Sequence, residues 1–173
     1  MSSNGNPESL VELAGIPQSS IGAPCPMILT SEHFLHLAYA VEEPLEPGEG
    51  ITPVMPGEYA PGRTCALIRF EHPYAHIFGP PGDEALQGHP LAPLGLSPNS
   101  AFEVKNSPWI RGVERMNSVD PAHRPEFFAP FRHFVFIFHD STFECIARSF
   151  EVSVHFASVA SVLRASWPGG EAS

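Results

Sequence analysis

Residues 131–155, FRHFVFIFHDSTFECIARSFEVSVH, decide the fold expected for this chain. Two runs, Phe131–His139 and Thr142–His155, are rich in aromatic and β-branched residues and are separated by Asp140 and Ser141. Aromatic and β-branched residues favour strands, whereas Asp and Ser favour turns because their side chains bond the nearby backbone. The stretch therefore predicts an antiparallel β-hairpin with a two-residue turn.

The two faces of this hairpin differ in chemistry, because side chains alternate from one face of a strand to the other. One face is apolar and should belong to the core: Phe134, Phe136, Phe138, Phe143, Cys145 and Ala147. The other is mixed: His133, Val135, Ile137, His139, Thr142, Glu144, Ile146 and Arg148. A two-residue turn places His139 opposite Thr142 and diagonal to Glu144, close enough for a side-chain contact.

The mixed face is the first candidate site. A carboxylate beside an imidazole fixes its tautomer and raises its pKa, which suits acid–base catalysis or metal ligation. The candidate catalytic residues are His139, Glu144 and His133, and these three with His76 are the candidate ligands of a divalent transition metal. Cross-strand ion pairs of Glu144 with His133 or Arg148 explain the same pattern without a function.

A second candidate site lies in residues 79–91, GPPGDEALQGHPL. Asp83 can cap a helical turn, and Gly88 can end that turn in the left-handed conformation. Loops held on a rigid scaffold often carry functional residues, so we expect this loop to close over the mixed face. With Arg148 as an anion-binding group, the candidate substrate-binding residues are Arg148, Asp83, Glu84 and His89.

Elsewhere, strand patterns outnumber helical ones. Strands are expected over 64–71, 74–78 and 101–105, and short helices over 7–15, 107–117 and 158–165. Residues 28–41 favour a strand by alternation, although Phe34, Leu37 and Val41 also fit one face of a helix that starts at Ser31. Strands and helices do not alternate along the sequence as they do in proteins with a parallel sheet, so an antiparallel sheet is expected. The expected fold is mainly β, an antiparallel sheet forming a barrel or a sandwich, with two or three short helices.

The domain organisation follows from composition. A single β-rich domain is expected over 28–167, after a flexible acidic N-terminal arm at 1–27 and before a disordered tail at 168–173. Within the domain, residues 42–62 are rich in Pro and Gly and predict a long loop.

Charge and cysteine usage exclude several protein classes. The net charge is −10, and residues 1–62 contain eight Glu and no Lys or Arg, which disfavours nucleic-acid binding. No signal peptide and no apolar run of 18 residues is found, so a membrane protein is not expected. The three Cys are widely spaced, which argues against a disulfide framework and favours the cytoplasm.

Two functions from different classes fit these patterns. The first is a small-molecule enzyme of lyase, isomerase or hydrolase type, with the His and carboxylate groups acting in acid–base or metal-assisted chemistry. The alternative is a non-catalytic protein-interaction or dimerisation module with an acidic arm. The expected partners are a small-molecule substrate and, as a further option, a second copy of the chain.

Overall fold

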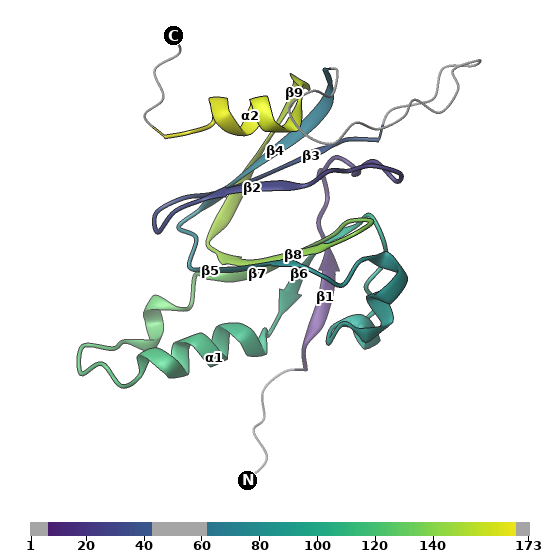
Figure 1. Ribbon diagram of the computed structural model, residues 1–173. Coiled ribbons are helices and arrows are strands. Elements are labelled where there is room, and N and C mark those ends of the chain that lie inside the picture. The colour runs from purple at the N-terminus through teal and green to yellow at the C-terminus, as the bar shows by residue number, and fades with distance from the viewer. Residues whose placement is uncertain (1–6, 43–61, 169–173) are drawn as a thin grey trace.

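The computed structural model describes residues 7–42 and 62–168 and shows a mainly β protein with two antiparallel sheets (Figure 1). The five-stranded sheet has the order β1-β6-β7-β8-β5, with β1 at Ser9–Glu12, β5 at Ala75–Gly79, β6 at Ala101–Lys105, β7 at Arg132–Ile137 and β8 at Thr142–Ala147. The four-stranded sheet has the order β2-β3-β4-β9, with β2 at Met27–Thr30, β3 at Leu35–Ala40, β4 at Arg63–Glu71 and β9 at Ser149–Ala157. The helices are α1 at Pro108–Asn117 and α2 at Val159–Ala165, with 3-10 turns η1 at Asp83–Gly88, η2 at Ala92–Leu94 and η3 at Pro125–Phe127.

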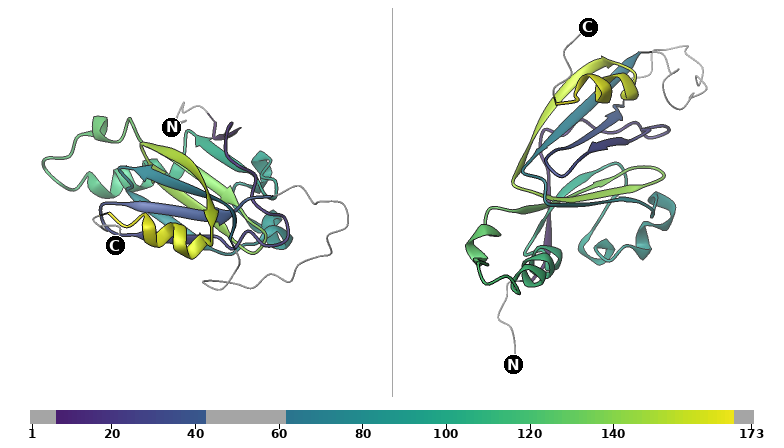
Figure 2. Two further views of the ribbon diagram at one scale, coloured as in Figure 1. Left: turned by 90° about the horizontal axis from the view of Figure 1, so that it is seen from above. Right: turned by 60° about the vertical axis from the view of Figure 1, so that its left-hand side comes forward.

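The two sheets form an open sandwich. They meet along one side, where β4 continues into β5 and β8 continues into β9, and they diverge from there (Figure 2). At this bend His72 adopts a positive φ of 49°, and the Arg148 N–H donates to the Glu71 carbonyl at 2.9 Å. The expectation of one strand over 142–155 is therefore wrong, because the chain changes sheets at Arg148. The barrel alternative is also wrong, because the sheets do not close on each other.

The main core lies between the sheets and confirms the predicted apolar face. All six predicted residues are buried in one cluster: Phe134, Phe136, Phe138, Phe143, Cys145 and Ala147. Their partners come from the other sheet and include Phe70, whose ring contacts the rings of Phe134 and Phe143 at centroid distances of 6.1 and 5.6 Å. Alternation of large aromatic residues thus fixes the packing face of the hairpin.

A smaller core covers the outer face of the five-stranded sheet. Val135 and Ile137 of β7 pack there against leucines of the η1–η2 segment: Leu86, Leu91 and Leu96. This apolar contact holds the loop against the mixed face of the hairpin, as the sequence predicts. It also carries His89, which lies between two of these leucines in the chain, to that face.

The hairpin register differs from the expected one by two residues. Thr142 lies opposite Ile137, and Glu144 lies opposite Val135, because the turn falls at His139-Asp140. The loop before η1 explains the difference, since the Asp83 N–H donates to the His139 carbonyl at 2.8 Å and holds His139 in the turn. A shift by two residues leaves every side chain on its predicted face but moves Glu144 from His139 to His133.

Most expected elements outside the hairpin are confirmed. Strands 64–71, 74–78 and 101–105 correspond to β4, β5 and β6, and the segment 28–41 forms two strands, β2 and β3. Helices 107–117 and 158–165 correspond to α1 and α2, whose N-caps Ser107 and Ser158 accept hydrogen bonds from the Ile110 and Ser161 N–H groups.

Two local helix predictions fail. The helix expected over 7–15 is wrong, because Ser9–Glu12 forms β1 and pairs with the edge of β6. Gly88 does not adopt the left-handed conformation, and Asp83 does not cap η1 with its side chain.

The division into an arm at 1–27 and a domain at 28–167 stays a prediction, although β1 joins the sheet. Residues 1–6, 43–61 and 169–173, which include most of the predicted loop and tail, lie outside the described residues.

Candidate functional site

Glu144 on β8 lies at the centre of a hydrogen-bonded group on the outer face of the five-stranded sheet. Its Oε2 accepts from Nε2 of His133 at 2.8 Å, and its Oε1 accepts from Nε2 of His89 at 3.2 Å. His133 comes from the neighbouring strand β7, and His89 follows η1. The structure therefore brings together three predicted site residues from two separate segments of sequence.

The second nitrogen of each imidazole is also bonded. Nδ1 of His89 accepts from the Leu91 N–H at 3.1 Å, which leaves Nε2 as the proton-bearing atom that faces Glu144. Nδ1 of His133 lies 2.9 Å from Oγ of Ser107, the N-cap of α1. The Ser107 hydroxyl can donate to this nitrogen while its oxygen accepts from the helix backbone. Both rings are thereby fixed in orientation.

This group, Ser107-His133-Glu144-His89, is almost closed to solvent. The side chains of His133, His89 and Glu144 are 4%, 5% and 14% exposed. Burial acts to raise the pKa of Glu144, but the hydrogen bonds and charges of His133 and His89 outweigh burial, so that the pKa is lowered from 4.5. Trp109 of α1 packs edge-on against the His133 ring, with centroids 5.0 Å apart. The arrangement is a buried, ionised carboxylate with matched donors.

Asp83 and His139 form a separate and more exposed pair. Oδ2 of Asp83 lies 2.8 Å from Nδ1 of His139, whose side chain is 40% exposed. The hydrogen bond that His139 donates to Asp83, and then the negative charges of Asp83 and Asp140, raise the pKa of His139 above 6.5. Because Nδ1 is bonded to Asp83, Nε2 is the nitrogen that can exchange a proton with a bound molecule; it lies 4.0 Å from Oδ1 of the exposed Asp140, beyond hydrogen-bond distance.

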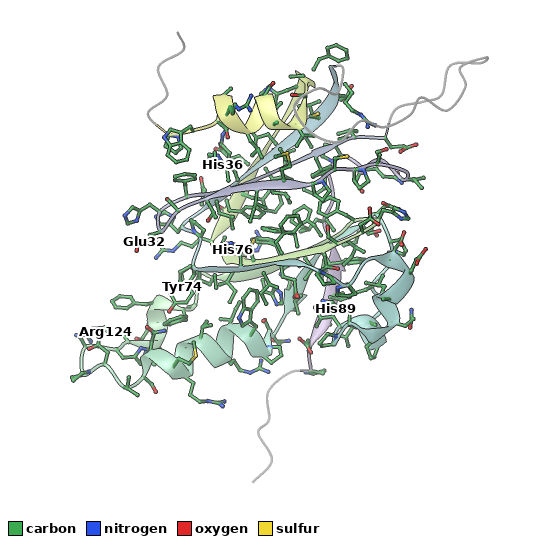
Figure 3. All side chains as sticks on the ribbon, in the orientation of Figure 1. Glu32, His36, Tyr74, His76, His89 and Arg124 are labelled. Carbon is green, nitrogen blue, oxygen red and sulfur yellow. The ribbon has the colours of Figure 1, made fainter. Side chains whose placement is uncertain are left out.

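The remaining predicted site residues lie elsewhere. Arg148 is exposed at the bend between β8 and β9, where its guanidinium lies 5.5 Å from the Phe131 ring centroid. Glu84 is exposed on η1. His76 lies opposite Cys145 in the β5–β8 pair, which puts it on the core side of the sheet, opposite to His89 (Figure 3). The expected contact of His139 with Glu144 does not form, because the register is shifted.

The predicted metal ligands His133, Glu144, His139 and His76 are thus distributed over three places. In the two described segments, no group of three or more His, Cys, Asp or Glu side chains is arranged to hold a metal ion. The structure therefore does not bring the four predicted ligands together. His133 and Glu144 bond each other, His139 bonds Asp83, and His76 lies on the other face.

A cavity of about 280 Å³ opens beside the β7–β8 turn. Most of its accessible surface is polar, although buried or partly buried apolar residues lie behind that surface: Leu13, Ile16, Tyr39, Phe136, Ile137 and Phe138. Its polar lining includes Glu12, Gln18, Ser19, Asn99 and Ser100. The Tyr39 hydroxyl donates to the Pro17 carbonyl at 2.7 Å and ties the chain after β1 to β3 across this space. The cavity lining includes Phe138, the residue before His139, but neither His139 nor Asp83 lines it.

Sequence reasoning missed the cavity residues and the role of Ser107. The cavity forms where four distant segments meet, and no local spacing indicates such a meeting. Ser107 carries a clear helix-capping signal, which is confirmed, but nothing near it in the sequence indicates that its hydroxyl also bonds His133.

No family model, no curated protein and no solved structure matches this chain. No helix in the described part is long and apolar enough to cross a membrane.

Proposed function

We propose that the protein is a small-molecule enzyme that acts by proton transfer, with His139 as the acid–base group and Asp83 as the carboxylate that orients it. One observation carries the proposal: the imidazole is bonded to a carboxylate through Nδ1 and is 40% exposed. A carboxylate on one ring nitrogen fixes the tautomer and stabilises the imidazolium that forms when the other nitrogen takes a proton.

The buried group around Glu144 holds the segment that carries Asp83 in place. Each nitrogen of His133 and His89 already has a hydrogen-bond partner, so neither ring has an atom left for a substrate. The group instead joins the η1–η2 segment to the sheet through His89. Since Asp83 begins η1, a fixed position of that segment also fixes the carboxylate beside His139.

The neighbouring cavity suggests the size and character of a substrate. At about 280 Å³ it suits a small molecule, and its mainly polar accessible surface favours a polar one. Glu12 and the hydroxyl and amide groups at the same cavity suit a polar or cationic part. Lyase, isomerase or hydrolase chemistry by proton transfer fits such a site without a covalent nucleophile.

The test is a turnover screen with matched variants. The purified protein is assayed with small esters, lactones, β-hydroxy acids and α-hydroxy ketones, which report hydrolysis, elimination and isomerisation. We expect His139→Gln to lower kcat by a factor of about 10²–10⁴, the usual contribution of general acid–base catalysis. His33→Gln, at an exposed position before β3, is the control and should leave kcat unchanged. Turnover that survives His139→Gln, or no turnover in any class, would reject the proposal.

A further inference from the structure

The last strand has a sequence that reads almost the same in both directions. Residues 150–156 are FEVSVHF, so that Phe matches Phe and Val matches Val about Ser153, while Glu151 matches His155. This segment is most of β9, which lies at the edge of the four-stranded sheet. In residues 7–42 and 62–168, β9 pairs with β4 alone.

The exposure of β9 is uneven along its apolar face. Phe150 and Val152 pack against the main core, and Phe150 contacts the Phe134 ring at 5.1 Å. Val154 and Phe156 lie on the same side of the strand but are 56% and 77% exposed. They occupy the end of β9 farther from the bend, where the two sheets diverge (Figure 2).

This edge lacks the usual protection against strand pairing. Exposed edge strands commonly carry Lys, Pro or a bulge, which oppose the addition of another strand. β9 has nine residues and continuous pairing with β4, and its only Asp, Glu, Lys, Arg or Pro residue is Glu151. Such a strand offers a row of backbone donors and acceptors to a partner strand.

We propose that β9 pairs antiparallel with β9 of a second copy of this chain, about a two-fold axis at Ser153. Each Phe156 then lies opposite Phe150 of the other copy, and each Val154 lies opposite Val152. The exposed side chains Val154 and Phe156 of each copy thereby lie beside the partly buried side chains Val152 and Phe150 of the other. The two four-stranded sheets become one continuous sheet.

Charge selects the same register. On the polar face, Glu151 of one copy lies opposite His155 of the other, so opposite or neutral groups meet rather than two carboxylates. A shift of the pairing by two residues toward the bend places Glu151 opposite Ser153 and Phe156 opposite Arg148, outside the strand. A shift by one residue puts the apolar side chains of one copy on the polar face of the other. A shift by two residues away from the bend places Glu151 opposite Ala157. Among these pairings, the one centred on Ser153 places the carboxylate opposite an imidazole.

The native mass of the full-length protein gives the first test. Light scattering after gel filtration should give twice the chain mass of 18.8 kDa. Val154→Lys places a charge inside the apolar contact, and we expect it to raise the dimer dissociation constant at least about 100-fold. Val119→Lys, at a position 86% exposed outside β9, is the matched control and should leave the dimer intact. A monomeric wild-type protein would overturn the proposal.

Cysteine cross-linking tests the register, starting from a Cys25→Ser background because Cys25 is the cysteine that is not buried. Ser153→Cys should form an intermolecular disulfide on mild oxidation, since residues directly opposite have β-carbons about 4.5–5.5 Å apart. Glu151→Cys should not link to itself, because the two copies are about 13 Å apart along the strand. Mixing Glu151→Cys with His155→Cys should restore the link. A dimer without the Ser153→Cys link, or one unaffected by Val154→Lys, would show that another surface is used.

Discussion

The Glu144 carboxylate and the His133 imidazole are joined by a 2.8 Å hydrogen bond that runs diagonally across the β7–β8 pair. Ser107 continues the chain of hydrogen bonds to the first turn of α1, and His89 continues it to the end of η1. One carboxylate therefore links the hairpin to two segments that cover its outer face. Loss of the Glu144 charge should therefore destabilise the packing of both segments on the hairpin.

Glu144→Gln tests this link, because it keeps the shape of the side chain and removes the charge. The amide nitrogen then faces either His133 or His89 in a site almost closed to water. Two donors meet there unless that imidazole changes tautomer, and the change takes the acceptor away from the Ser107 hydroxyl or the Leu91 N–H. We expect the free energy of unfolding to fall by about 1–3 kcal/mol in urea titrations. Glu126→Gln, at an exposed position in η3, should change it by less than about 0.5 kcal/mol. Equal effects of the two substitutions would contradict the role of Glu144.

The same carboxylate should make the stability depend on pH in acid. Burial alone would raise the pKa of Glu144, but the hydrogen bond from His133 and the contacts with both imidazoles hold it below 4.5 in the folded protein. A carboxyl whose folded pKa is depressed stabilises the fold above its unfolded pKa, and this contribution is lost as the pH falls through the folded pKa. The difference in unfolding free energy between wild type and Glu144→Gln should therefore shrink below pH 4.5. A difference that stays constant from pH 7 into that range would refute the assignment.

The faces of the hairpin could be predicted from sequence, whereas its register could not. Alternation with a period of two puts the phenylalanines of β7 on the core face for any even shift of the pairing. The register depends on the position of the turn, which the Asp83 N–H and the Thr142 hydroxyl fix through contacts with residues of other segments. These contacts are long-range in sequence, so no local pattern indicates them.

The candidate site was predictable in its residue types and in one pair, Glu144 with His133, which the cross-strand alternative includes. His133, Glu144 and His89 could be identified because ionisable side chains stand out on a strand face and in a well-packed loop. The partner of His139 could not, since Asp83 is the first residue of η1 and lies 56 residues away in the sequence. Pro7 and Gly15 predict a helix between them, but residues 9–12 form a strand because pairing with β6 overrides their local preference.

Asp83→Asn should lower the pKa of His139 toward 6.5. The hydrogen bond and the negative charge of Asp83 are the two largest causes of the raised pKa, and the charge of Asp140 is the third. A proton titration of the His139 ring by NMR should show a larger decrease for Asp83→Asn than for Asp140→Asn. The reverse order would mean that Asp83 does not orient the imidazole.

The same pair carries a pH dependence of opposite sign to that of Glu144. Because the folded pKa of His139 is raised, its interaction with Asp83 favours the fold fully below pH 6.5, and this contribution disappears as the pH rises through the folded pKa. His139→Gln should remove this dependence. A wild-type protein whose stability is the same at pH 5.5 and at pH 8 would argue against the pairing.

Gly82→Ala should disturb the Asp83–His139 pair through the backbone, because Gly82 lies against the turn of the hairpin. A β-carbon there would lie 2.6 Å from the His139 carbonyl oxygen and 3.0 Å from backbone atoms of Asp140, none of which can move without shifting the turn. We expect a loss of about 1–3 kcal/mol in the free energy of unfolding and a His139 pKa closer to 6.5, measured by urea titration and NMR. Gly88→Ala is the matched control, because a β-carbon at Gly88 meets nothing within 4 Å. It should leave the His139 pKa unchanged and, because alanine restricts the unfolded chain, leave stability equal or higher by up to about 1 kcal/mol. If Gly82→Ala were as harmless as Gly88→Ala, the close packing of the loop on the turn could not be what holds Asp83 beside His139.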